Sequence, residues 1–108
     1  MNNAGAGDHT TLLQATPEQI QRDFGINTFS TIYMTQAVVG AGKMPRGGRV
    51  INIGSIVSKM GIEVSAVYAA AKAAQDSLTA SWAGEVSLLF LLFILLPASC
   101  LTISLAWP

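Results

Sequence analysis

Apolar residues recur at helical spacing from residue 17 to about residue 39. The residues that fall roughly on one face are Ile20, Phe24, Ile32 and Tyr33. This spacing is typical of an α-helix, so we predict a helix over residues 17–39. The glycines and the proline of GAGKMPRGG, residues 40–48, end it, because both residue types disfavour a continued helix.

The start of this helix carries its own signal. The preceding residues 1–16 are rich in glycine, asparagine and threonine and are predicted to form a loop. Thr16 can cap the helix, Pro17 suits its first turn, and Gln19 follows three positions after Thr16. This is the arrangement of a capping box, so the helix is predicted to begin at Pro17.

A short strand and a second helix follow. Val50, Ile51 and Ile53 in RVINIGS are β-branched and bounded by glycines, which predicts a strand buried on both faces, as in a parallel sheet. After a loop, Ser65 or a neighbour is predicted to begin an alanine-rich helix that ends near Gly84. The order loop, helix, strand, loop, helix is typical of an α/β layer protein.

The last part of the chain is apolar and differs from the rest. No charged residue follows Glu85, and the eleven-residue run from Val86 to Leu96 is apolar except for Ser87. Extended to Trp107 it reaches 22 residues, or about 33 Å as a helix, which is enough to cross a bilayer. Pro97 in its middle and the lack of basic flanking residues count against a membrane span.

Bulk composition narrows the partners. At 108 residues the chain is long enough for one small domain, and its formal charge of zero gives no field that would attract nucleic acid. We therefore predict no nucleic-acid partner. The single histidine, His9, has no second candidate ligand nearby, so we predict that it is a solvated loop residue and that there is no metal site.

The candidate chemistry lies in VYAAAKAAQ, residues 67–75. Tyr68 and Lys72 are four positions apart, so they share one face of the predicted helix. A nearby lysine cation favours the phenolate form of tyrosine, which makes the pair a candidate general acid and base. The alternative is a tyrosine packed on the core with a lysine whose stem lies over the surface. Ser55 directly follows the strand, at the edge of a parallel sheet where ligands bind.

Three segments occur in a specific order and spacing: NNAG at 2–5, INIGS at 51–55 and YAAAK at 68–72. Together with Asn27 in the first helix, they resemble the short-chain dehydrogenase/reductase family, from Asn2 to about Glu85. The resemblance implies an α/β fold, part of a Rossmann-type doubly wound domain, with the loop-helix-strand-helix segment in residues 1–85. Residues 86–108 are then an apolar tail outside the family pattern.

The resemblance also implies a role for each matching residue. Tyr68 would donate or accept the substrate proton, and Ser55 would orient the reacting oxygen. Lys72 would favour the tyrosine phenolate and hydrogen-bond the ribose of an NAD or NADP cofactor. Asn27 would position a water that links Lys72 to solvent; the alternative is a solvent-facing helix residue.

In NNAG, the resemblance implies that Asn3 contacts the cofactor, while Gly5 would allow close backbone approach. With Tyr68 and Lys72, these two residues complete the expected cofactor-binding set.

Two departures from the family pattern argue against full activity. The sequence holds no glycine-rich turn between a buried strand and a helix, where the dinucleotide pyrophosphate would bind. We therefore expect weak or no dinucleotide binding by this chain, which calorimetric titration with NADH and NADPH would test. The tail replaces an expected strand, so we also expect the edges of the strand at 49–54 to be left uncovered.

Three origins are considered for the tail, in this order: unrelated sequence joined to a family fragment, a membrane-seeking tail, and a divergent core segment. The predicted function is NAD(P)-dependent hydride transfer on a small carbonyl or alcohol substrate, impaired in this chain. The alternatives are a non-catalytic remnant that self-associates or pairs with relatives through its two long helices, and a tail-anchored degenerate reductase. The predicted location is cytoplasmic, with membrane association through residues 86–107 as the alternative.

Overall fold

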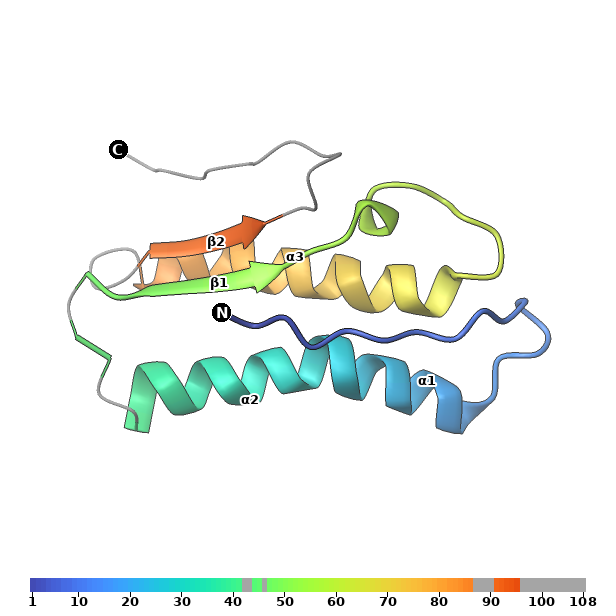
Figure 1. Cartoon of the computed structure of the whole chain (residues 1–108), viewed down its shortest axis with the longest axis horizontal. Helices are drawn as coiled ribbons and strands as arrows, with labels where there is room; N and C mark the ends of the chain where they lie inside the picture. The colour runs from blue at the N-terminus through green and yellow to red at the C-terminus, as the bar shows by residue number, and fades with distance from the viewer. Residues whose placement is uncertain (42–43, 46, 87–90, 96–108) are drawn as a thin grey trace.

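The computed structural model describes residues 1–41, 44–45, 47–86 and 91–95. Strand β1 (Arg49–Ile53) is followed by the long helix α3 (Ala66–Val86) and then by strand β2 (Leu91–Leu95), which pairs with β1 in parallel. These three elements form a βαβ unit, in which α3 lies behind both strands (Figure 1). A second, longer helix precedes β1 in the chain and packs along α3.

That preceding helix runs without a break from residue 17 to residue 41, and two of its stretches are π-helical instead of α-helical. Its segments are α1 (Pro17–Phe24), η1 (Gly25–Phe29), α2 (Ser30–Gln36) and η2 (Ala37–Ala41). The predicted helix over residues 17–39 is therefore confirmed. So is the capping box: the Thr16 hydroxyl accepts from the Gln19 N–H at 3.3 Å, and the Gln19 side chain accepts from the Thr16 N–H at 3.0 Å.

The buried face of this helix is polar. The residues that it buries are Asp23, Asn27, Thr28, Thr31 and Thr35. The apolar face that indicated the helix points outward in part, since Ile20 and Tyr33 are 40% and 66% exposed. Hydrogen bonds join the polar stripe to α3, because the Thr28 hydroxyl donates to the carbonyl of Ala71 at 2.8 Å and Gln75 donates to Thr31 at 2.9 Å.

Strand β1 packs one of its faces against α3. Val50 and Asn52 are buried, and the Asn52 amide donates to the Thr79 hydroxyl of α3 at 2.8 Å. Ile51 and Ile53 on the opposite face are only half-buried. The predicted burial on both faces is therefore wrong for one face, because α3 covers only the side on which Val50 and Asn52 lie.

Both edges of β1 have a neighbour. Every β1 residue from Arg49 to Ile53 is in register with a β2 residue, from Leu91 to Leu95. On the other side Asn2 forms a single parallel bridge with Asn52, through hydrogen bonds of 2.7 and 3.0 Å to the Ile51 carbonyl and the Ile53 N–H. The expectation that the edges of this strand are uncovered is therefore wrong on the β2 side.

The tail thus contains a sheet strand, which is the role of the core segment that we placed last among its origins. A single membrane helix over residues 86–107 is wrong for Leu91–Leu95, which is extended. Among the residues that the structure describes, no helix is both long and apolar enough to cross a bilayer. Residues 87–90 and 96–108 lie outside the described ranges, so the origin of the tail and the boundary at residue 85 stay predictions.

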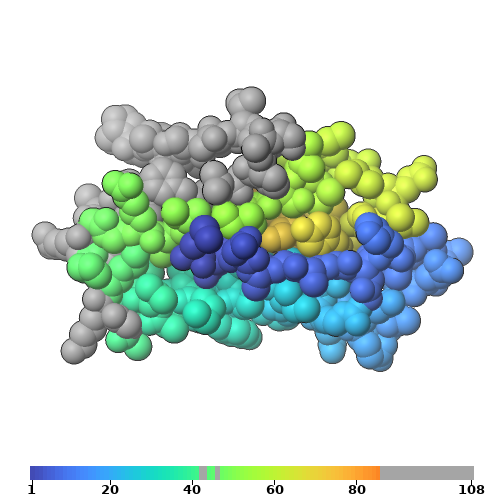
Figure 2. All heavy atoms as spheres, viewed as in Figure 1, coloured from blue at the N-terminus to red at the C-terminus, as the bar shows by residue number. Residues whose placement is uncertain are grey.

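Helix α3 begins directly after Ser65, as predicted, and ends at Val86, two residues beyond Gly84. The N-terminal segment runs past its first turns. In the space-filling view this segment starts between β1 and the α1–α2 helix and continues between the first turns of α3 and that helix (Figure 2). The Thr10 N–H donates to the Val64 carbonyl at 2.8 Å, and the His9 ring lies 3.3 Å from the Ser65 hydroxyl, so the segment also contacts the loop that leads into α3.

Candidate active site

The candidate site lies where β1 ends and the N-terminal segment crosses α3. Asn2 fixes the start of this segment, since its amide donates to the Asn52 side chain at 2.8 Å. Two glycines follow at positions 5 and 7. Their lack of a side chain allows the backbone to lie directly against Lys72 and Tyr68, one helical turn apart on α3.

Asn27 holds the middle of this segment. It is fully buried, and its side-chain oxygen accepts from the Ala6 N–H at 3.3 Å while its NH₂ donates to the Ala6 carbonyl at 2.5 Å and to the Asp23 carbonyl at 2.8 Å. The alternative of a solvent-facing helix residue is therefore wrong. Asn27 lies in the π-helical turn η1, and such turns often occur at functional sites.

The Lys72 ammonium is buried at the carboxyl end of β1. Lys72 is only 3% exposed, and its Nζ donates to the Ile53 carbonyl at 3.0 Å and to the Gln75 side chain at 3.2 Å. Burial disfavours the charged form and lowers the pKa of Lys72 below its usual 10.5, while the negative charge of Asp76 acts in the opposite direction. Lys72 therefore lies inside the molecule, unlike a lysine whose head group extends from the surface.

Tyr68 is half-buried one turn before Lys72. A Cβ atom placed on Gly7 would lie 2.6 Å from the Tyr68 Cγ and Cδ2 atoms and 2.7 Å from its Cβ atom. These distances are far inside van der Waals contact, so only glycine at position 7 lets the backbone pack against the tyrosine in this position. The same construction at Gly5 reaches 3.3 Å from Lys72 Nζ and 3.4 Å from the Asn27 side-chain oxygen.

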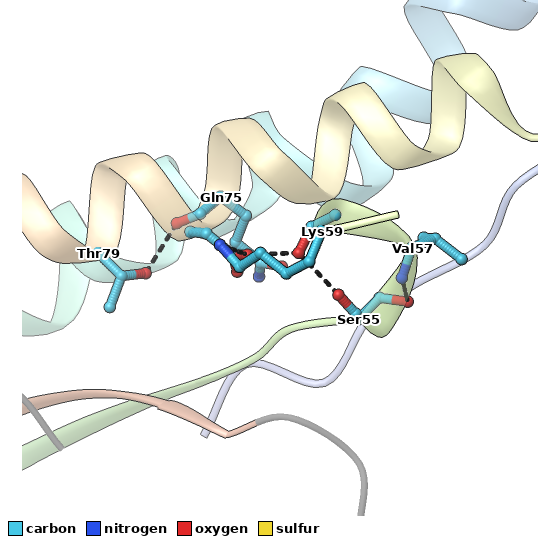
Figure 3. Close-up of polar contacts among 7 residues, drawn as sticks. Ser55, Val57, Lys59, Gln75 and Thr79 are labelled. Carbon is cyan, nitrogen blue, oxygen red and sulfur yellow. Dashed lines mark hydrogen bonds and ion pairs between the residues drawn. The ribbon is translucent and has the colours of Figure 1, made fainter. Parts of the chain in front are cut away.

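Ser55 follows β1 and caps the short turn η3 (Ile56–Ser58). Figure 3 shows it where the strand ends, with its hydroxyl oxygen directed at the Val57 N–H, 3.4 Å away. The turn is joined to α3 because the Ser58 hydroxyl donates to Asp76 at 2.5 Å and Lys59 forms an ion pair with the same carboxylate at 3.0 Å. Ser55 is thus held beside the helix that carries Tyr68 and Lys72.

The structure brings some of the predicted residues together and separates others. Gly5 lies against both Lys72 and Asn27. Asn3 is exposed and makes no hydrogen bond to another described residue. Within the described ranges no hydrogen bond joins the Ser55 hydroxyl to Tyr68. The water relay predicted for Asn27 stays a prediction. In the structure, the backbone carbonyl of Asn27 accepts a hydrogen bond from the Thr31 hydroxyl at 3.3 Å.

Several residues of the site were missed by sequence reasoning. They are Asn2, Gly7, Thr31, Asn52 and Gln75. In the sequence Gly7 is one of several loop glycines, and Thr31 and Gln75 are polar residues 44 positions apart, joined only in the structure. The spacing of four between Asp23, Asn27, Thr31 and Thr35 was the one signal that could have shown the polar buried stripe.

Comparison with known proteins places this segment. The family described as short chain dehydrogenase matches residues 1–89. The oxidoreductase asL5 of Sarocladium schorii is 40% identical over 86 residues, which is 80% of this chain and 34% of that protein. Sorbitol dehydrogenase of Cereibacter sphaeroides is 40% identical over 82 residues, 75% of this chain and 32% of that protein. The chain therefore spans about a third of the length of these relatives.

Solved structures show the same fold. The angucycline C-6 ketoreductase LanV, crystallised with bound NADP, superimposes with a TM-score of 0.80 at 23% identity, over 86% of this chain and 36% of that one. A short-chain dehydrogenase from Streptomyces avermitilis gives a TM-score of 0.78 at 26% identity, over 86% of this chain and 35% of that one. Both solved chains are longer than this one and have a Rossmann-type fold, of which this chain matches about a third.

Proposed function

Because the chain belongs to the short-chain dehydrogenase family, we propose that it forms the proton-transfer part of an oxidoreductase acting on a small carbonyl or alcohol substrate. The cofactor in this proposal is NAD or NADP. The observation that carries it is the placement of Tyr68 and Lys72 against the glycine-containing segment 5–7, at the carboxyl end of β1.

The residues present fit the ribose end of a nicotinamide dinucleotide. The Lys72 ammonium has three N–H groups, of which Ile53 and Gln75 accept two. The backbone of Gly5 is exposed beside it, and a side chain there would fill the space 3.3 Å from Nζ. We therefore propose that a ribose hydroxyl accepts from Lys72 past Gly5, with Asn3 and Tyr68 as the further cofactor contacts. When bound, the dinucleotide supplies or accepts the hydride.

The side chains of this chain would handle the proton and the reacting oxygen. Tyr68 would donate its phenol proton to the carbonyl oxygen during reduction and take a proton from the alcohol during oxidation. Ser55 would donate a hydrogen bond to the same oxygen and orient it. Asn27 would act through Ala6, since its amide holds the backbone segment that packs against Tyr68 and Lys72.

A chimaera tests this proposal. Residues 1–85 replace the matching segment of the sorbitol dehydrogenase of Cereibacter sphaeroides, and sorbitol-dependent reduction of the nicotinamide cofactor is followed by absorbance. We expect an active chimaera in which Tyr68→Phe lowers turnover by about 10²–10⁴-fold, the usual contribution of a positioned general acid. Tyr33→Phe is the matched control, because Tyr33 is 66% exposed on α2 and should tolerate the loss of its hydroxyl.

The proposal is wrong if the folded chimaera keeps its turnover after Tyr68→Phe, or loses it equally after Tyr33→Phe. Circular dichroism establishes whether each variant is folded. A folded chimaera with no activity in any form would also count against it, because the segment would then lack the working groups.

A second candidate function, self-association, rests on a specific surface. Apolar side chains are exposed along the outer side of the α1–α2 helix, namely Phe29 at 43%, Tyr33 at 66%, Met34 at 55% and Val38 at 40%. Packing of this apolar stripe against a second copy of the chain would remove these side chains from water. Sedimentation velocity over a range of concentrations tests this: Tyr33→Glu should weaken association, and a monomer at all concentrations would exclude it.

A further inference from the structure

We propose that Gln75 is a positioning residue for Lys72: its side-chain amide fixes the ammonium at the end of β1 and connects it, through Thr31, to the backbone carbonyl of Asn27. The catalytic meaning of this arrangement rests on the proposed function of Lys72. The hydrogen bonds of Gln75, and their effect on the titration of Lys72, do not depend on that proposed function.

A chain of four groups carries the proposal. Lys72 Nζ donates to Gln75 Oε1 at 3.2 Å, and Gln75 Nε2 donates to Thr31 Oγ1 at 2.9 Å. The Thr31 hydroxyl donates to the Asn27 carbonyl at 3.3 Å. Two of the residues with predicted catalytic roles, Lys72 and Asn27, are thus joined by protein groups, across α3 and the α1–α2 helix.

The direction of every hydrogen bond in this chain is determined by chemistry. An ammonium can only donate, so the Gln75 amide must present its oxygen to Lys72. Its NH₂ group then faces Thr31, whose hydroxyl accepts and is free to donate its own proton to the backbone carbonyl of Asn27. All three bonds point away from the ammonium, and such aligned dipoles stabilise its positive charge.

The burial of Gln75 indicates that its side-chain amide serves to form hydrogen bonds. Gln75 is 1% exposed, Lys72 3% and Thr31 2%. A buried amide is costly unless both of its ends have partners, whereas an apolar side chain at the same place would need none. Both ends of Gln75 have partners, and one of them is the ammonium.

Gln75 acts without adding a charge. The titratable groups near Lys72 are Asp76, which favours its charged form, and Tyr68, one turn earlier on α3. Asp76 is itself paired with Lys59 at 3.0 Å and accepts from Ser58. Because an ammonium rotates about its last bond, two acceptors at fixed places set the direction of its third N–H. Gln75 and the Ile53 carbonyl are those two acceptors.

The test follows the titration of the Lys72 side chain by NMR in the full 108-residue chain. Gln75→Leu removes the acceptor, so the Lys72 pKa should fall by about one pH unit, the value of one hydrogen bond to a charged group. Gln75→Glu keeps the shape and adds a negative charge, so the Lys72 pKa should rise. Thr79→Val is the control, since it removes two buried hydrogen bonds one turn later on α3, one accepted from the Asn52 amide and one donated to the Gln75 backbone carbonyl. Neither bond involves Lys72 or the side chain of Gln75.

Shifts of opposite sign in the two Gln75 variants, with none in the control, support the proposal. If Gln75→Leu does not fold, Gln75→Glu decides, because it retains the size of the side chain. A Lys72 titration that is unchanged in a folded Gln75→Glu variant, or that moves equally in Thr79→Val, overturns it. Because this test measures the titration of Lys72 and not activity, an inactive chimaera would contradict the proposed function without affecting the conclusion about Gln75.

Discussion

Two glycines determine how closely the N-terminal segment approaches α3. Gly5 lies against the Lys72 ammonium and the Asn27 amide, and Gly7 lies against the Tyr68 ring. The role of Gly5 could be anticipated from its place in NNAG. Gly7 could not, because a glycine in a loop has the same appearance in a sequence whether its backbone faces solvent or an aromatic ring.

Gly7→Ala is therefore expected to displace Tyr68 or the segment. The new methyl group would meet atoms near the root of the tyrosine, which cannot move without moving α3. We expect a loss of about 1–3 kcal/mol in the free energy of unfolding and a fall in chimaera turnover. Urea unfolding and the sorbitol assay measure the two effects.

Gly25→Ala serves as the matched control, because nothing lies within 4 Å of a Cβ atom at that helical position. It should leave turnover unchanged and raise stability by up to about 1 kcal/mol, the helix-propensity difference. Equal effects of the two substitutions would show that Gly7 has no special contact.

Buried Lys72 predicts a pH dependence of stability. Its pKa in the folded chain lies below the usual 10.5, so between the two values the folded state holds fewer protons than the unfolded state. Stability from this group therefore rises with pH in that window, and below the folded pKa the full cost of burying the charge is present. The difference in unfolding free energy, Lys72→Met minus wild type, should decline as pH approaches 10.5. A difference that grows with pH would contradict this.

At the scale of elements, the sequence indicated both helices and β1 more accurately than their packing. Thr16, Pro17 and Gln19 signal the helix start through local chemistry, which tertiary contacts did not override. The same helix buries polar residues because α3 offers partners, such as the Ala71 carbonyl and the Gln75 amide. Those partners are more than forty positions away, so apolar periodicity could not reveal which face is buried.

Asn27 is the connection between the α1–α2 helix and the N-terminal segment. Asn27→Ala removes the side-chain hydrogen bonds to the Ala6 N–H and to the Ala6 and Asp23 carbonyls, so we expect a loss of about 1–3 kcal/mol in stability. The Ala6 amide should also exchange its hydrogen faster. Gln21→Ala, on the exposed side of the same helix, should change neither quantity. An unchanged hydrogen-exchange rate at Ala6 in the Asn27 variant would show that Asn27 does not hold the N-terminal segment in place.

At the scale of the whole molecule, β2 is the element that sequence reasoning missed. Its residues, LLFIL, lie within an uncharged apolar run that has neither strand-bounding turns nor alternation, so a strand and a buried helix look alike there. The parallel pairing with β1 resolves the ambiguity and covers one edge of the strand that carries Ser55 at its end.

Ile94→Pro should break this pairing, because proline cannot donate to a strand ladder and Ile94 is in register with Asn52. We expect the exposed edge of β1 to promote association between copies, which light scattering would show as larger particles. Ile94→Val, which keeps the N–H group and the strand propensity, is the control. Identical particle sizes in the two variants would mean that β2 does not protect β1.

The central claim is that this chain holds Tyr68 and Lys72 against the glycine-containing segment at the end of β1. Nuclear Overhauser measurements on the 108-residue chain test it most directly. We predict cross-peaks between the Gly7 α-protons and the Tyr68 ring, and between the Gly5 α-protons and the Lys72 ε-methylene group, whose carbon lies 3.6 Å from the Gly5 Cβ position. An intact α3 with neither cross-peak would contradict the claim.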